Sequence, residues 1–182
     1  MPRLDKPRIK PIPPEEWPED ANLKERARLK GRALNIFRTL ANHPVLLDRW
    51  MTFGNYVLFK STLPAREREL LILRIGWLCQ SEYEFGQHTL IGLDNGMTAE
   101  EIERIKQGPE ATGWSEPDRL LLQAADELHN DSFISDATWQ GLQSKYNEQQ
   151  LIDVVFTVGQ YTLVSMALNS FGVQLDEGVP GF

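Results

Sequence analysis

The sequence predicts an all-α protein, a single-domain bundle of about six to eight helices. Apolar residues recur every three to four positions along most of the chain, which is the spacing of one helix face. Sequences typical of helix starts and ends separate these stretches, and no segment alternates convincingly as a half-buried strand would. The chain has 182 residues, 41% of them hydrophobic, which suits one ordinary domain with a single core.

The first segment, residues 1–21, is predicted to be an extended proline-rich arm that precedes a helical domain at residues 22–182. Six of the 11 prolines lie in the first 18 residues, and proline fixes φ and removes a backbone donor. Ile12 and Trp17 could dock the arm on its own subunit or on a neighbouring one, and a frayed end is the alternative. Charged residues occur throughout this segment, so it does not resemble a signal peptide.

Two helices are expected before residue 60. Residues 22–41 carry an apolar stripe that ends at the His43–Pro44 break, and residues 45–59 carry a second stripe. Residues 61–64, with a proline suited to a first turn, then mark another helix start. The helical pattern that follows stops at Asn95–Gly96, a sequence typical of a left-handed helix exit.

Four further helices are expected, and each begins at a capping residue. These residues are Thr98, Ser115, Ser135 and Asn147. The last helix is expected to reach about Phe171. It includes much of the uncharged stretch 154–175, whose amides and hydroxyls would be costly in a lipid bilayer. We therefore expect a helix buried in the bundle rather than a membrane span.

Charge and cysteine content exclude several classes of function. There are 19 basic and 26 acidic residues, a net charge of −7, and no long cluster of Lys or Arg, so we expect no nucleic-acid partner. The single cysteine, Cys79, excludes an intramolecular disulfide and a cysteine-based zinc site. One cysteine also suits a reducing compartment, and we expect a cytoplasmic protein.

The segment at residues 63–88, LPARERELLILRIGWLCQSEYEFGQH, is the part of the sequence that indicates chemistry. In one straight helix, Glu69 and Glu84 would lie about 22 Å apart and could not act together. Ser81 and Glu84 resemble a capping box, which would begin a new helix. We therefore predict that the helix breaks between Gly76 and Ser81 and that the second piece turns back toward the first.

This segment resembles the carboxymuconolactone decarboxylase family, whose superfamily includes alkylhydroperoxidase-D-like proteins. The resemblance rests on Arg-Glu-Leu-x-Ile-Leu-Arg, on Ser-Glu-Tyr-Glu-x3-His and on a later helix that ends Ser-Phe-Gly-Val. It covers most of the chain after the arm and is strongest at residues 63–103. The resemblance implies an alkylhydroperoxidase-D-like fold and a homo-oligomer, commonly a trimer or a hexamer.

The peroxidase branch of this superfamily has a glutamate, a Cys-x-x-Cys pair and a histidine four residues after the second cysteine. That glutamate corresponds to Glu69 and the histidine to His88, but Ser81 and Glu84 occupy the two cysteine positions. Cys79 lies two residues before the first position and does not replace it. Thiol peroxidases need both an attacking and a resolving thiol, so this chain resembles a branch that lacks this chemistry.

The three remaining groups, Glu69, Glu84 and His88, suit proton transfer. The resemblance implies a cofactor-free acid/base enzyme of the decarboxylase or lyase type, acting on a small carboxylated lactone or carbonyl compound. His88 would be the acid, Glu84 a base or orienting group, and Glu69 a second partner of the imidazole. Two alternatives remain, namely hydroperoxide reduction and a non-catalytic helical protein that binds ligands or assembles.

Three residues are candidate substrate contacts: Arg74, Tyr83 and Ser81. Arg74 is the nearest basic residue in the sequence that could meet a substrate carboxylate, and a buried salt bridge to Glu69 or Glu84 is the alternative. Gln160, Tyr161 and Asn169 in the last helix form a second group of interest. Buried amides need partners, which another helix or a bound ligand could provide.

A metal site is a further possibility that we do not expect. Glu84 and His88, four residues apart on one helix face, could hold an ion between them. A stable site needs at least a third ligand, which His43 or His129 would have to supply from a distant helix. We therefore predict neither a metal nor a cofactor, and a small molecule as the substrate.

Overall fold

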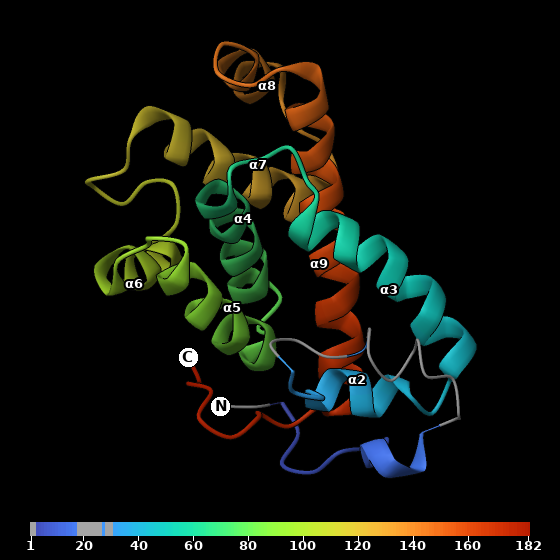
Figure 1. The fold of residues 1–182 in the computed structure, drawn as a ribbon. Coiled ribbons are helices and arrows are strands. Elements are labelled where there is room, and N and C mark those ends of the chain that lie inside the picture. The colour runs from blue at the N-terminus through green and yellow to red at the C-terminus, as the bar shows by residue number, and fades with distance from the viewer. Residues whose placement is uncertain (1–2, 18–26, 28–30) are drawn as a thin grey trace.

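The central element of the bundle is a helix that is buried on every side. The computed structural model describes residues 3–17, 27 and 31–182. In this part of the chain, helix α4 (Ala65–Leu78) is buried continuously from Arg68 to Gly76 and packs against α5, α7 and α9. Figure 1 shows α4 and α9 beside each other in the middle of the molecule, with the remaining helices around them. The run of apolar residues in α4 explains this central position.

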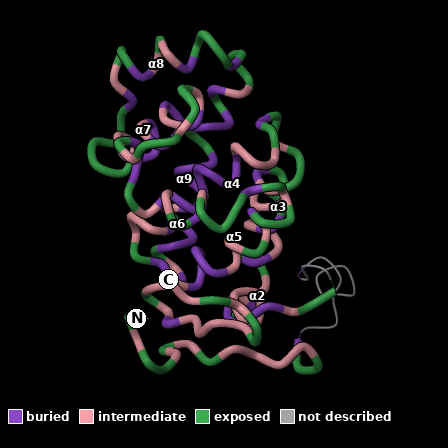
Figure 2. The backbone as a smooth tube through the Cα atoms, turned by 90° about the vertical axis from the view of Figure 1, so that its left-hand side faces the viewer, coloured by how far each residue is buried: buried purple, intermediate pink, exposed green. Residues whose placement is uncertain are grey.

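The order of elements confirms the all-α prediction for the part of the chain that the structure describes, where eight α-helices and no strand occur. Besides α4, they are α2 (Asn35–Leu40), α3 (Pro44–Phe59), α5 (Glu82–Asp94), α6 (Ala99–Gln107), α7 (Glu116–Asp131), α8 (Asp136–Gln143) and α9 (Glu148–Phe171). A short 3-10 helix, η1 (Pro14–Glu16), precedes them. In Figure 2, the buried backbone runs along α4 and α9, while the turns around α8 are exposed.

Side-chain caps begin the later helices where the sequence predicts them. Thr98 and Asn147 form complete capping boxes at α6 and α9, and Ser115 and Ser135 accept backbone hydrogen bonds at α7 and α8. By length and composition alone, α9 could also cross a membrane, but 56% of its most apolar 18-residue window is buried within the bundle.

The helix expected at residues 22–41 is wrong in its described part. Residues 22–26 and 28–30 lie outside the described residues, and the helix begins only at Asn35. Gly31 has a φ of +77°, and Leu34 is extended with a ψ of 156°, so neither fits a continuous helix. The apolar spacing in this segment therefore indicates residues that pack against the bundle, but it does not indicate an unbroken helix.

The two ends of the described chain pack against α3 and α5. Trp17, which is buried, packs with Leu47 and Met51, and its indole N–H donates to Ile12 O at 3.0 Å. At the other end, Pro180 crosses α5 so closely that a Cβ on Gly86 would lie 2.0 Å from its carbonyl oxygen. The two ends lie near each other in Figure 1.

Candidate active site

The predicted break between the two site helices is confirmed. Helix α4 ends at Leu78 and α5 begins at Glu82, and between them Gln80 adopts a φ of +51°. Ser81 N donates to Gly76 O at 2.9 Å, which closes the turn. A Cβ on Gly76 would lie 3.4 Å from Glu84 Cγ, so glycine permits the close approach of α5 to α4.

The reason given for the break is wrong in one respect, because Ser81 and Glu84 do not form a capping box. Ser81 is the N-cap of α5, but its hydroxyl makes no cap hydrogen bond and is buried without a partner. The Glu84 carboxylate turns toward His88 instead. Ser81 does not line the pocket described below, so the structure gives no contact that would support it as a substrate ligand.

The break brings together the three groups that the sequence singles out. His88 Nδ1 lies 2.6 Å from Glu69 Oε2, and His88 Nε2 lies 3.2 Å from Glu84 Oε1. The exposed fractions of these residues are 0% for Glu69, 3% for Glu84 and 6% for His88. Glu84 Oε1 is a close charge neighbour of Nε2 but makes no aligned hydrogen bond. The imidazole is therefore fixed by a short contact to Glu69 at Nδ1, whereas its Nε2 makes no aligned hydrogen bond to Glu84.

Sequence reasoning missed Arg68, which is the fourth charged member of this cluster. Its Nε and Nη2 lie 3.3 Å and 3.2 Å from Glu69 Oε1. Adjacent residues on a helix do not normally face each other, so the position of Arg68 next to Glu69 gave no signal. The cluster of Glu69, Glu84, His88 and Arg68 contains two carboxylates and two cationic groups, and its formal charge is balanced when His88 is protonated.

The carboxylates keep His88 protonated. Burial alone would lower the pKa of His88, but the charge and hydrogen bond of Glu69, with a further contribution from Glu84, raise it from 6.5 to about 10. Burial raises the pKa of the Tyr161 phenol well above its usual value of 10.0, and the same carboxylates act in the same direction. At neutral pH the site therefore contains an imidazolium beside a neutral phenol.

A small pocket lies against the Glu84 and His88 side of the cluster. Its volume is about 90 Å³, and most of its wall is apolar, formed by α2, α3, α5 and α9. Gln160 and Tyr161 of α9 also line it, and the Tyr161 ring lies edge-on to the imidazole at 4.9 Å. Glu69 does not reach the pocket. The arrangement offers a proton donor and a carboxylate to a small ligand.

Tyr83 lines this pocket as expected, but its hydroxyl is already engaged. It donates to Asp176 Oδ2 at 2.5 Å, and Asp176 also accepts from Gln87 Nε2 at 2.8 Å and from Asn35 N at 3.0 Å. The ring of Tyr83 is thus a wall of the pocket. Asp176 lies in the C-terminal segment, and it fixes this wall from outside.

Comparison with known proteins agrees with the fold and with the motif. The sequence matches the model of the carboxymuconolactone decarboxylase family over residues 44–127, which include Glu69, Glu84 and His88. The fold is similar to that of an uncharacterised peroxidase-related protein from Ralstonia eutropha JMP134, an alkylhydroperoxidase AhpD core. The TM-score is 0.82 at 18% identity, over 93% of this chain and 92% of that chain. Residues 44–127 thus carry the pattern of the carboxymuconolactone decarboxylase family, and the chain has an AhpD-like fold.

Two further solved structures share this fold. A peroxidase-related protein from Silicibacter sp. TM1040 has a TM-score of 0.79 at 16% identity, over 98% of this chain and 93% of that chain. A debrominase in complex with 2,3,4-tribromopyrrole has a TM-score of 0.77 at 11% identity, over 93% of this chain and 91% of that chain. No curated protein matches the sequence. At these identities the structural likeness shows the fold.

Arg74, expected to meet a substrate carboxylate, does not line the pocket. Its Nε and Nη2 pair with Asp126 at 2.6 Å and 2.8 Å, and its Nη1 donates to Ile105 O at 2.8 Å. The alternative, a bridge to Glu69 or Glu84, is not formed. A Cβ on Gly108, whose φ is +91°, would lie 2.7 Å from Arg74 Nη2. Arg74 therefore joins α4 to α7 and to the end of α6.

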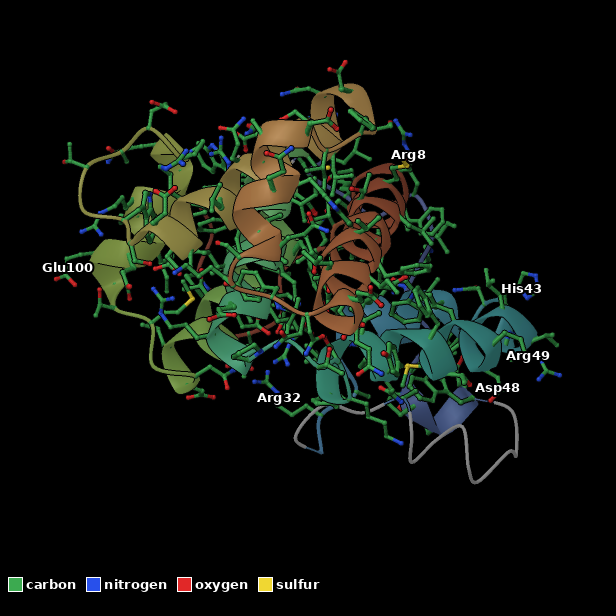
Figure 3. The ribbon with its side chains drawn as sticks, turned by 90° about the horizontal axis from the view of Figure 1, so that it is seen from above. Arg8, Arg32, His43, Asp48, Arg49 and Glu100 are labelled. Carbon is green, nitrogen blue, oxygen red and sulfur yellow. The ribbon has the colours of Figure 1, made fainter. Side chains whose placement is uncertain are left out.

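The other two histidines lie away from the site. His43 is the exposed N-cap of α3, where its Nδ1 accepts from Leu46 N at 3.3 Å, and it points outward in Figure 3. His129 is exposed near the end of α7, with its Nδ1 3.9 Å from Cys79 Sγ. Within the described residues, no group of three His, Cys, Asp or Glu side chains is arranged to hold a metal ion.

Cys79 does not take over the role of the missing superfamily cysteines. It is the C-cap of α4 and does not line the pocket. Burial raises the pKa of its thiol above the usual 9.0, whereas attack on a peroxide requires a thiolate. Its carbonyl oxygen accepts from Asn169 Nδ2 at 2.9 Å, so the chain itself satisfies that half-buried amide.

Proposed function

We propose that this protein is an acid/base enzyme, of the isomerase or lyase type, that moves a proton on a small neutral carbonyl compound. The observation that carries the proposal is the protonated His88 held between two buried carboxylates at the wall of a pocket. Groups whose pKa is strongly shifted by specific charge partners are frequent in active sites. The superfamily's fold and motif support an enzyme, and the arrangement of these side chains supports the reaction class.

Each of the three groups has a separate task in this proposal. Glu69 accepts the Nδ1–H of His88 and fixes the ring, which leaves the Nε2–H as the donor on the pocket side. The substrate carbonyl oxygen accepts that Nε2–H. Glu84, as a carboxylate, removes a proton from the carbon next to the carbonyl, and the electron pair moves onto the oxygen. Return of the proton to a different carbon gives isomerisation, and expulsion of a leaving group gives a lyase reaction.

Two features favour a neutral substrate over a carboxylated lactone. Arg74, the residue expected to meet a carboxylate, pairs with Asp126, and Arg68 pairs with Glu69. No Lys or Arg, these two included, is among the described residues that line the pocket. A buried substrate carboxylate would then lack a counter-ion, at a large cost in free energy. The debrominase of the same fold, bound to 2,3,4-tribromopyrrole, is consistent with a compact ring as the ligand.

Proton exchange in heavy water tests the function directly. We expect the wild-type protein to accelerate deuterium incorporation next to the carbonyl of at least one member of a panel of small neutral ketones and lactones, followed by NMR. His88→Ala and Glu84→Gln should each lower the rate by about 100- to 10,000-fold, as expected for loss of a general acid or base. His129→Ala, at an exposed histidine, is the matched control and should leave the rate unchanged. Equal rates in wild type and His88→Ala would refute the proposal.

We also propose that the protein is a homo-oligomer that associates through α3 and α9. Large apolar side chains are exposed along these helices, including Phe59 at 61%, Phe156 at 53%, Leu163 at 55% and Met166 at 61%. A continuous apolar face of this kind is typical of a subunit interface. Since Phe59 also lines the pocket, a second copy would lie close to its mouth.

Sedimentation provides the test of association. We expect a mass that is a multiple of 20.8 kDa, with a trimer or hexamer the expectation from the superfamily. Met166→Glu should shift the distribution toward the monomer because it buries a charge in the interface. Gln143→Glu, at an exposed position of α8, should not. A monomer of the wild-type protein at micromolar concentration would contradict the proposal.

A further inference from the structure

We propose that the pocket selects substrates that carry a neutral N–H or O–H donor beside the reacting carbonyl, and that Gln160 is the residue that recognises this donor. The inference rests on the proposed function, because it names the substrate class of the same site. It starts from a polar side chain that the fold itself leaves without a partner.

Gln160 is almost completely buried, with 4% of its surface exposed, yet its Oε1 accepts no hydrogen bond. The side chain lies between α9 and α3, with its Nε2 3.6 Å from the Cβ position that Gly54 would have. Gln160 is also part of the pocket wall. Buried amide oxygens nearly always have a partner, and leaving one unpaired costs free energy. A ligand donor in the pocket would supply the missing bond.

This acceptor lines the same pocket as His88 and Glu84. Tyr161 follows Gln160 in α9 and contacts the His88 ring edge-on at 4.9 Å. The pocket has a volume of about 90 Å³ and is open on one side, so a single small ring can lie partly inside it. A ligand of this size that offers its carbonyl to His88 Nε2 therefore has its remaining polar atoms near Gln160.

The charges around the pocket favour a neutral donor. Glu69 and Glu84 already flank the imidazolium, and Arg68 completes the balance. A cationic ligand would add a positive charge beside two cations, and an anionic ligand would find no free cation among the described pocket residues. A lactam, a hydroxyketone or an N–H heterocycle has the required features: one small ring or chain, one carbonyl or equivalent acceptor, and one neutral donor.

Two five-membered rings that differ in one atom provide the test. The lactam 2-pyrrolidinone has an N–H where γ-butyrolactone has an ether oxygen, and both have the same carbonyl. Dissociation constants are measured by NMR titration for wild type, for Gln160→Leu and for the matched control Gln143→Leu, at an exposed glutamine on α8. We expect the ratio of lactam to lactone affinity to fall about tenfold in Gln160→Leu and to stay unchanged in Gln143→Leu.

The ratio cancels the different hydration of the two probes, because both proteins bind from the same solution. An unchanged ratio in Gln160→Leu would overturn the proposal, and so would equal weakening of both probes, which would indicate a bound water or a packing role. Gln160→Met gives the same comparison if the leucine variant does not fold. The measurement needs no turnover. A shifted ratio without catalysis would refute the proposed reaction alone, and catalysis that depends on His88 with an unshifted ratio would refute this inference alone.

Discussion

Replacement of Glu69 by glutamine is expected to lower the free energy of unfolding by about 3 to 5 kcal/mol. The Glu69 carboxylate is fully buried and is shared by two cations, His88 Nδ1 at 2.6 Å and Arg68 Nη2 at 3.2 Å. Glutamine has nearly the same shape but no charge, so both cations would lose their main counter-ion inside the protein. Loss of one member of a buried ion pair is costly because the remaining charge stays desolvated.

Urea unfolding followed by circular dichroism measures this loss. Glu100→Gln is the control, since Glu100 lies at the exposed start of α6 and points into solvent in Figure 3. We expect that variant to stay within about 0.5 kcal/mol of wild type. A change of less than about 1 kcal/mol in Glu69→Gln would mean that the buried cluster contributes little to stability, which would contradict the electrostatic account.

The second large effect is a decline of stability with rising pH that depends on His88. The imidazole has a pKa of about 10 in the folded protein, against 6.5 in its unperturbed state. A pKa raised by folding stabilises the protein fully below pH 6.5. This stabilisation decreases as pH rises above 6.5 and is lost once the pH passes 10. In this window, the unfolded chain has released the proton while the folded protein still holds it.

The slope should approach 1.4 kcal/mol per pH unit at its steepest, the value for one proton. Between pH 6.5 and about pH 8, the neighbouring Tyr161 phenol and Cys79 thiol contribute little, since their ordinary pKa values are 10.0 and 9.0 and folding raises both. Unfolding free energies at intervals of half a unit provide the measurement. His88→Asn should flatten the slope, and a wild-type protein whose stability is constant over this range would disprove the protonated imidazole.

The convergence of Glu69, Glu84 and His88 could be predicted from the sequence because it depends on a local break. Gly76 and the polar Ser81 interrupt an otherwise helical pattern. A second helix that turns back at this break must pack against the first one, the central helix α4. The conformation of the turn itself could not be predicted from the sequence. The hydroxyl of Ser81 does not cap α5, and Gln80 forms the turn with a positive φ, which a glutamine rarely adopts.

The partners of the charged residues could not be predicted, because long side chains reach across elements that are distant in the sequence. Arg74 pairs with Asp126 on α7, and neither residue carries a pattern that links it to the other. The amides of α9 were more informative, since the sequence left open whether another helix or a ligand would pair with them. The Asn169 amide donates to Cys79 O of the chain itself, whereas the buried Gln160 Oε1 has no partner.

The close crossing of Pro180 over Gly86 ties the pocket to the last residues of the chain. Through Asp176, the same segment holds Tyr83 and Gln87, which line the pocket. A protease that trims this tail would leave Glu69, Glu84 and His88 intact and yet release the wall that shapes their substrate site. Degradation from the carboxyl end would therefore produce a protein with every reactive group present and a misshapen pocket around them.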